Sequence, residues 1–254
     1  MASPVFIASI LTILPAMGAM WYFLNRYEGY FEDARVFISL VFGFFAGLVA
    51  SAFEVFAFGF GTAEFEAAAG VATAFIFYVA GYGFFETGIK AAVLGLKQYR
   101  HRKDTPYYGV AFGLGFGAIL AMMTIAVNIS NVGGLHNYDM GPFLAMVMLP
   151  LGGIFVHGAI GAWVGQGVVD GKLWKGWGMG TLLAMPLLGS AWLSLPTAGT
   201  NTANWFPAWF AILYGASLLM IAQVRLLDHV VPPEVADQVR RAKRREARRQ
   251  DKER

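Results

Sequence analysis

The sequence predicts an all-α integral membrane protein, a polytopic bundle of about seven transmembrane helices. Hydrophobic residues make up 57% of the 254 positions and charged residues only 14%, and the mean hydropathy is +0.55. These values lie well outside the range of soluble globular chains. Period-2 alternation is missing, and an open sheet edge cannot lie in lipid, so helices are favoured over strands.

Seven apolar windows are long enough to cross a bilayer as helices, which takes about 20 residues at a rise of ~1.5 Å per residue. The first has no basic segment before it and is too long for a signal-peptide core, so we expect it to be a mature span. The third and fifth are long enough to tilt or to break at a glycine. We expect one membrane domain, residues 1–231, and a basic tail, residues 232–254. The windows are 4–24, 36–61, 67–96, 107–131, 141–168, 174–195 and 205–226.

The basic residues predict the orientation of these spans, because Lys and Arg accumulate on the cytoplasmic side. Eighteen of the nineteen lie in the first, third and fifth links or between Arg225 and the C-terminus. The even-numbered links and the N-terminal segment carry none. The sequence therefore predicts a multi-pass protein of the cell membrane, with its N-terminus outside and its C-terminus in the cytoplasm. The exception is Lys90, inside the third window.

Four ionisable residues within the windows are candidates for function: Glu54, Glu86, Lys90 and His157. A charge at mid-bilayer costs at least ~2.5–3.5 kcal/mol, so such groups pair or act. Glu86 and Lys90 are four residues apart on one helix, and we expect them to form a supporting ion pair. Glu54 lies nearer the outer end of its span, and we expect it to reach water there.

Glu86 and His157 are the candidate catalytic pair. Each lies about 15 Å from the inner end of its span by residue count, so the two side chains can meet. A carboxylate beside a neutral imidazole in a dry cavity is the minimum needed to deprotonate water. A structural hydrogen bond or a proton relay is the simpler alternative. One histidine and one acid at this depth are too few for a metal site, and we expect no metal and no cofactor.

A series of motifs over residues 15–195 resembles the PrsW family, glutamic intramembrane proteases of the CAAX-protease and bacteriocin-processing superfamily. The resemblance rests on the order and spacing of the motifs. It implies a core formed by the third to sixth spans around a cavity open to the cytoplasmic half. The motifs are Trp21-Tyr22, Asn25-Arg26-Tyr27-Glu28, Phe31-Glu32-Asp33, Phe85-Glu86-Thr87-Gly88-Ile89-Lys90, Tyr108-Gly109, Gly113-Leu114-Gly115-Phe116 and His157-Gly158-Ala159-Ile160-Gly161 with Gly165.

The chain departs from the family pattern at several functional positions. In that family, as the resemblance implies, a Glu-Glu-x-x-Lys helix supplies the acid that activates water. Here Glu86 and Lys90 match, but the second acid is replaced by Thr87. Polar positions of two later motifs are occupied by other residues. These are Leu120 and Ala121 in one motif and Gly189 and Leu193 in the other.

Three functions are open at this point. Losing a positioned acid or base lowers a rate ~10²-fold to 10⁴-fold, so we favour a pseudoprotease that binds transmembrane segments or stabilises a membrane complex. An active glutamic protease is the alternative, with Glu86 as general base and His157 as donor to the oxyanion. A small transporter or proton pathway through Glu86, Lys90 and His157 is the third, although the internal repeat typical of transporters is missing.

The tail following Pro232 and Pro233 is rich in Lys and Arg and lacks an apolar stripe after Val239. We expect it to be a topology signal and a solvated helix, with attraction to anionic lipid. No aromatic residues are interleaved with the basic ones, so we expect no nucleic-acid partner. The expected partners are the lipid bilayer and a transmembrane protein that is substrate or ligand.

Overall fold

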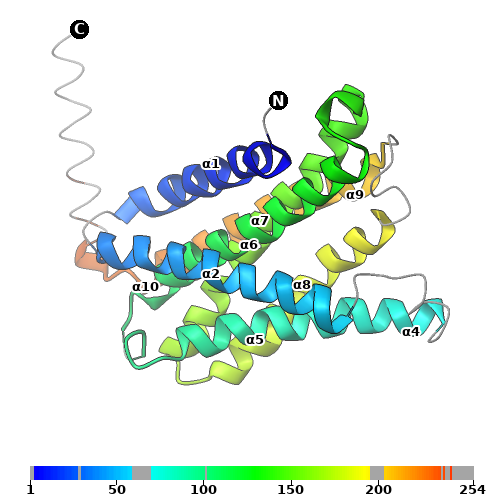
Figure 1. Ribbon diagram of the computed structural model, residues 1–254. Helices are drawn as coiled ribbons and strands as arrows, with labels where there is room; N and C mark the ends of the chain where they lie inside the picture. Colours follow the sequence, from blue (N-terminus) through cyan, green and yellow to red (C-terminus); the bar gives the residue numbers. More distant parts are fainter. Residues whose placement is uncertain are drawn as a thin grey trace, which may run out of the picture.

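The computed structural model describes residues 3–27, 30–58, 70–100, 102–194 and 203–235, together with positions 237 and 241. Over these ranges the secondary structure is helical and contains no strand, which confirms the all-α prediction. The helices form one elongated bundle (Figure 1). Most of the predicted tail, the links 62–66 and 196–202, and Glu28 lie outside the described residues.

The long helices follow the predicted windows to within a few residues. The first begins with Ser3, whose hydroxyl accepts a hydrogen bond from the Phe6 amide at 3.2 Å, and with Pro4 at its first position; both residues are favourable there. The helices are α1 (Pro4–Leu24), α2 (Asp33–Phe58), α4 (Val71–Ile76), α5 (Gly83–Leu94), α6 (Thr105–Asn131), α7 (Met140–Val169), α8 (Leu173–Ser194), α9 (Trp205–Ala222) and α10 (Asp228–Val230), with short η1 (Asn25–Tyr27) and η3 (Leu135–Asn137).

Five described helical segments are long and apolar enough to cross a membrane. The other two predicted windows are also helical, but their crossing of the bilayer stays a prediction, as do the count of seven and the orientation. The five segments are Pro4–Leu24, Asp33–Glu54, Thr105–Asn131, Met140–Val169 and Trp205–Val230.

The third window, 67–96, which we expected to tilt or to break at a glycine, is not one continuous α-helix over its described residues. A π-helical segment, η2 (Phe77–Tyr82), separates α4 from α5, and a second, η5 (Gln223–Leu227), joins α9 to α10. Gly81 and Gly83 flank the end of η2, where the small residues leave the backbone least constrained. Such π segments occur frequently at functional sites, and α5, which carries Glu86 and Lys90, begins directly after this one.

Helices α6 and α7 form the inner pair of the bundle. The membrane-crossing windows of α6 and α7 are 67% and 61% buried, whereas that of α1 is 17% buried. Their backbones meet at glycines: a Cβ added to Gly109 would collide with the carbonyl oxygen of Gly161, and one added to Gly113 with that of His157. Small residues allow this approach in lipid, where dispersion rather than the hydrophobic effect holds helices together. The close packing of α6 on α7 therefore depends on these glycines.

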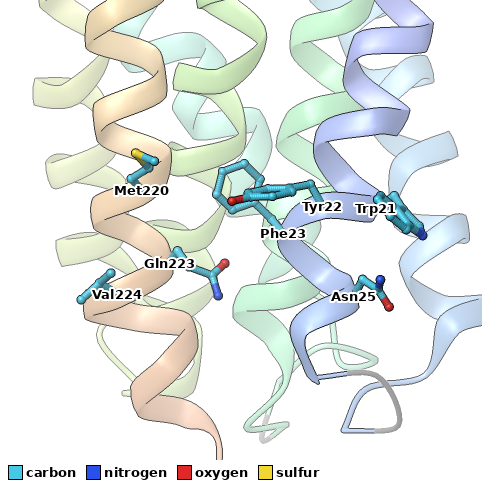
Figure 2. A pocket seen from close by; sticks show the side chains of 7 residues that line it. All are labelled: Trp21, Tyr22, Phe23, Asn25, Met220, Gln223 and Val224. Atoms are coloured by element: carbon cyan, nitrogen blue, oxygen red, sulfur yellow. The ribbon is translucent and has the colours of Figure 1, made fainter. Parts of the chain in front are cut away.

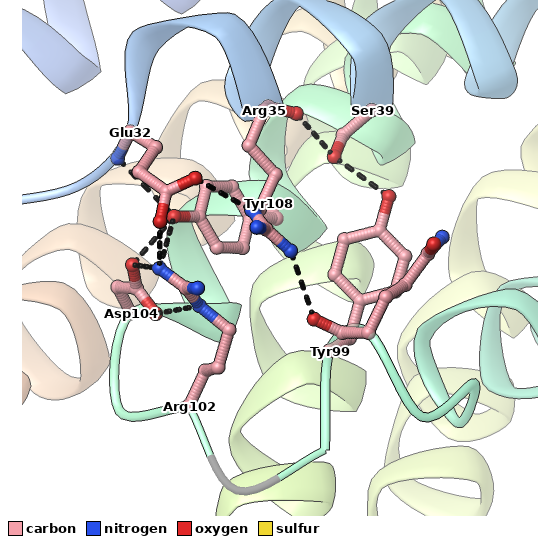
Figure 3. A network of polar contacts seen from close by, with 8 residues as sticks. Glu32, Arg35, Ser39, Tyr99, Arg102, Asp104 and Tyr108 are labelled. Carbon is pink, nitrogen blue, oxygen red and sulfur yellow. Dashed lines mark hydrogen bonds and ion pairs between the residues drawn. The ribbon is translucent and has the colours of Figure 1, made fainter.

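A polar network closes one end of the bundle (Figure 3). The Arg102 guanidinium contacts Glu32 at 2.7 Å and Asp104 at 3.0 Å. Arg35 contacts Glu32 at 3.0 Å, and the Tyr108 hydroxyl donates to Asp104. This network joins the start of α2 to the link before α6.

Two tyrosines extend the connection to the last helices. Tyr30 donates its hydroxyl to the Val230 carbonyl at 2.8 Å, and Tyr107 donates to the Leu227 carbonyl at 3.0 Å. The first link, the third link and the segment before the tail therefore lie at the same end of the bundle. This is the arrangement that the alternation of Lys and Arg along the sequence requires.

The Gly113 contact predicts a stability difference between two alanine substitutions. Gly113→Ala pushes α6 away from the carbonyl of His157 and should destabilise the fold by about 1–3 kcal/mol. Gly178→Ala is the matched control, because nothing lies within 4 Å of a Cβ added there. Thermal unfolding of the detergent-solubilised variants measures both. Equal midpoints for the two variants would contradict the packing.

The polar network predicts a loss of stability in acid. Hydrogen bonds from Arg102 and Arg35 lower the pKa of Glu32 from its ordinary 4.5. Burial acts to raise the pKa of Asp104, but hydrogen bonds from Arg102 and Tyr108 outweigh it and hold the pKa below 3.8. Because both folded-state pKa values are lowered, the ionised groups stabilise the fold at neutral pH, and this contribution is lost as the pH falls through those lowered values.

The variant Asp104→Asn should therefore melt a few degrees lower than the wild type at pH 7, a small effect because the network is partly exposed. At low pH the two proteins should converge. A constant difference in melting temperature from neutral pH to acid would show that the Asp104 charge is not responsible.

Candidate functional site

Four helices supply the candidate site, a cluster of ionisable side chains inside the bundle. Glu54 comes from α2, Glu86 and Lys90 from α5, and His157 from α7, while α6 contributes the Phe116 ring. Each ionisable residue is 4% exposed or less, so the structure is closed around the cluster. The core was predicted to consist of the third to sixth spans, but the second span, α2, also contributes a residue, Glu54.

Glu86 and His157, the predicted pair, lie together. The Nε2 atom of His157 is 3.8 Å from Oε2 of Glu86, beyond a direct hydrogen bond but within reach of one bridging molecule or a small side-chain movement. The two residues thus meet as the depth estimate predicted. Their catalytic roles stay a prediction.

The position of His157 depends on the inner helix pair. Its ring packs edge-on against Phe116 of α6, with centroids 5.3 Å apart. A Cβ added to Gly117 would lie 3.0 Å from the ring atom Cδ2 of His157. Glycine at position 117 therefore leaves room for the imidazole ring. The glycines of α6 both allow α7 to pack closely and make space for His157.

The Lys90 side chain is fully buried in the cluster. Its Nζ atom is 3.6 Å from the Phe116 ring centroid, a cation–π contact, and donates to the backbone carbonyl of Glu86 at 3.2 Å. The expected ion pair between Glu86 and Lys90 is therefore not formed as a direct contact, because the ammonium contacts the Glu86 backbone and not its carboxylate. It supplies one positive charge to a site that holds two carboxyl groups.

Glu54 is the functional candidate that sequence reasoning placed wrongly. We expected it to reach water near the outer end of its span, but it is 3% exposed, and its carboxyl lies within hydrogen-bonding range of that of Glu86. The preceding residues hold the helices together, because the rings of Phe53 and Phe85 stack with centroids 4.4 Å apart. Counting residues along the spans failed because α2 is inclined to α5, so that its later turns reach that helix (Figure 1).

A sequence signal for Glu54 does exist. Gly43 and Gly47 both face the α6 backbone at Phe112 and Phe116. Glu54 follows Gly47 by seven residues, which is two helical turns, so it lies on the same inward face of α2. A carboxyl group on the face that contacts α6 cannot be on the outer, solvated surface.

Several buried polar atoms around the cluster have no hydrogen-bond partner among the described residues. Buried polar groups are nearly always paired in native proteins, so such a group of unpartnered atoms indicates a site that accepts a small polar molecule. The atoms are Ser51 Oγ, Glu54 Oε1, Glu86 Oε2, Thr87 Oγ1 and His157 Nδ1.

Leu120 and Leu193, two of the positions at which the chain departs from the PrsW pattern, add no polar group to this cluster. Leu120 packs against the aromatic cluster of Phe112 and Phe116, and Leu193 is 54% exposed on the outer surface. Thr87, in the place of the second acid, is fully buried. The second carboxyl of the site comes instead from α2.

Comparison of the chain with protein-family models, with curated proteins and with solved structures gives no match. The resemblance to the PrsW family therefore rests on the motifs in the sequence.

The charge balance of the cluster predicts strong coupling between Lys90 and Glu86. Lys90→Met removes the only positive charge that these four residues supply and leaves a buried carboxylate uncompensated, which should cost about 3–5 kcal/mol of unfolding free energy. In the double variant with Glu86→Gln the carboxylate is gone, so the total cost should be well below the sum of the two single costs. A double-variant cycle in detergent measures this, and simple additivity would contradict the electrostatic coupling of Lys90 to Glu86.

Proposed function

We propose that the Glu54–Glu86–His157 cluster is an acid–base centre and that the chain is a PrsW-like intramembrane peptidase. The burial of Glu54 beside Glu86, on helices held together by the stacked rings of Phe53 and Phe85, is the observation that carries the proposal. Glu54 supplies, from another helix, the second acid whose replacement by Thr87 had favoured a pseudoprotease. We therefore favour an active peptidase over a pseudoprotease.

Two carboxyl groups buried side by side in a dry site cannot both be ionised at low cost, and pairs of this kind share a proton. With one ammonium at Lys90, the cluster is electrically neutral when one carboxyl is ionised and the other protonated. One group can then accept a proton while its partner donates one. This is the arrangement that lets aspartic proteases activate water without a metal.

In the proposed reaction, water attacks the carbonyl carbon of a peptide bond within a transmembrane segment. Glu86 accepts the proton of the water, and the proton held by Glu54 passes to the carbonyl oxygen. The gem-diol intermediate then collapses: Glu86 gives its proton to the leaving nitrogen as the C–N bond breaks, and one diol hydroxyl returns a proton to Glu54, which leaves a carboxylic acid and an amine. His157, 3.8 Å from Glu86, donates a hydrogen bond to the oxygen that gains charge.

The binding role remains the second candidate, and the burial of the cluster favours it. All four ionisable residues are at most 4% exposed, so a substrate enters only if helices move apart. Helix α5 is the helix that we expect to move, because the π segment η2 precedes it and it lies between Gly83 and Gly95. A pseudoprotease would use the same scaffold to hold a transmembrane segment without cleaving it.

Reconstitution in vesicles with labelled single-span proteins tests the proposal. Wild type should cleave, and Glu54→Gln and Glu86→Gln should each lower the rate by at least about 10²-fold, the usual effect of removing a positioned acid or base. The double variant should be little worse than either single one, because the two groups act as a unit. Glu32→Gln, an exposed acid outside the cluster, is the matched control and should keep full activity.

Two results would overturn the proposal. Full activity in Glu54→Gln with loss of activity in Glu86→Gln would show that the carboxyl pair is structural. No cleavage by the wild type, together with a bound single-span protein that is retained through purification, would establish the pseudoprotease role.

A further inference from the structure

A pocket of about 540 Å³ lies between α1 and α9, away from the ionisable cluster. Helix α1 packs on α6, and α9 packs on α7, so the pocket lies in the groove between two outer helices. Figure 2 shows the rings of Tyr22 and Phe23 and the amide of Gln223 facing one another across it. The volume lies within the range of pockets that bind small molecules.

The pocket lies at the polar end of the bundle. It is next to the last turn of α1 and the start of η5, close to the segments joined by the bond from Tyr30 to Val230. Trp21 and Tyr22 are each 67% exposed, and such rings favour the membrane–water boundary. An occupant at this level has a polar part in the interface and an apolar part in the bilayer.

The rim of the pocket is apolar and faces outward. Met220 and Val224 are 58% and 56% exposed on the outer side of α9 and η5, where acyl chains lie in a membrane. A water-soluble ligand would gain little from this rim. The surface suits an amphipathic molecule.

The hydrogen bonds of Gln223 determine the chemistry of the polar part. Its Nε2 donates to Oδ1 of Asp228 at 3.1 Å, and a carboxylate can only accept, so this bond fixes which way the amide points. The Oε1 atom is then left buried and without a hydrogen-bond partner, in a residue that is 7% exposed and lines the pocket. The site therefore needs a donor from its ligand.

We propose that this groove binds a phospholipid whose headgroup carries a primary ammonium, as in phosphatidylethanolamine. The ammonium donates to Oε1 of Gln223, and the nearby Asp228 carboxylate and the Tyr22 ring favour a positive charge. A choline headgroup has no N–H and cannot make this bond. The acyl chains lie along Met220 and Val224.

Native mass spectrometry of the purified protein with synthetic lipids of matched chains tests the site. Phosphatidylethanolamine should bind about tenfold more tightly than phosphatidylcholine, the effect of one hydrogen bond to a charged group. Gln223→Leu should abolish this preference. The matched control is Gln166→Leu, because Gln166 donates to Asp170 at 2.8 Å in the same way and also has an unpartnered buried Oε1, but does not line this pocket.

A second variant keeps the test independent of the amide. Val224→Trp fills the rim of the groove while leaving Gln223 in place, and it should weaken binding of both lipids. Equal binding of the two lipids by the wild type, an unchanged preference in Gln223→Leu, or equally tight binding of phosphatidylglycerol would overturn the proposal. None of these results depends on proteolysis, so the lipid-binding proposal is tested independently of the proposed peptidase function.

Discussion

Ionisable groups inside an apolar bundle need partners, and this requirement organises the centre of the protein. Two carboxyl groups, an ammonium and an imidazole are buried on three helices, α2, α5 and α7. Each alone would cost several kcal/mol in such surroundings. In the proposed charge state they bring one charge of each sign, a proton for the second carboxyl and a neutral imidazole, and this balance forms only when the helices are assembled.

The packing that assembles the cluster comes from small residues. Glycines of α6 meet the α7 backbone at Gly161 and His157, and glycines of α2 meet the α6 backbone at Phe112 and Phe116. In lipid there is no hydrophobic driving force between helices, so the dispersion attraction between closely packed backbones holds them together. The same glycines leave room for the imidazole. Helix association and placement of the chemistry therefore depend on the same positions.

Hydropathy was sufficient to predict the helices, because each must satisfy its own backbone within the membrane. It could not predict the π segment before α5, which depends on local backbone geometry around Gly81 and Gly83. The meeting of Glu86 and His157 followed from counting residues along two spans that begin at the same end. Counting failed for Glu54, because it assumes parallel helices and α2 is inclined to α5. The chemistry of the site, which depends on side-chain contacts between helices, was predictable only in part.

Infrared spectroscopy of the protonated carboxyl band measures the central claim most directly. If Glu54 and Glu86 share one proton, the wild type at neutral pH shows a protonated carboxyl, and either Glu54→Gln or Glu86→Gln removes it, because the remaining carboxylate is then balanced by Lys90. A wild-type spectrum without the band, or a band that survives both substitutions, would contradict the shared-proton pair.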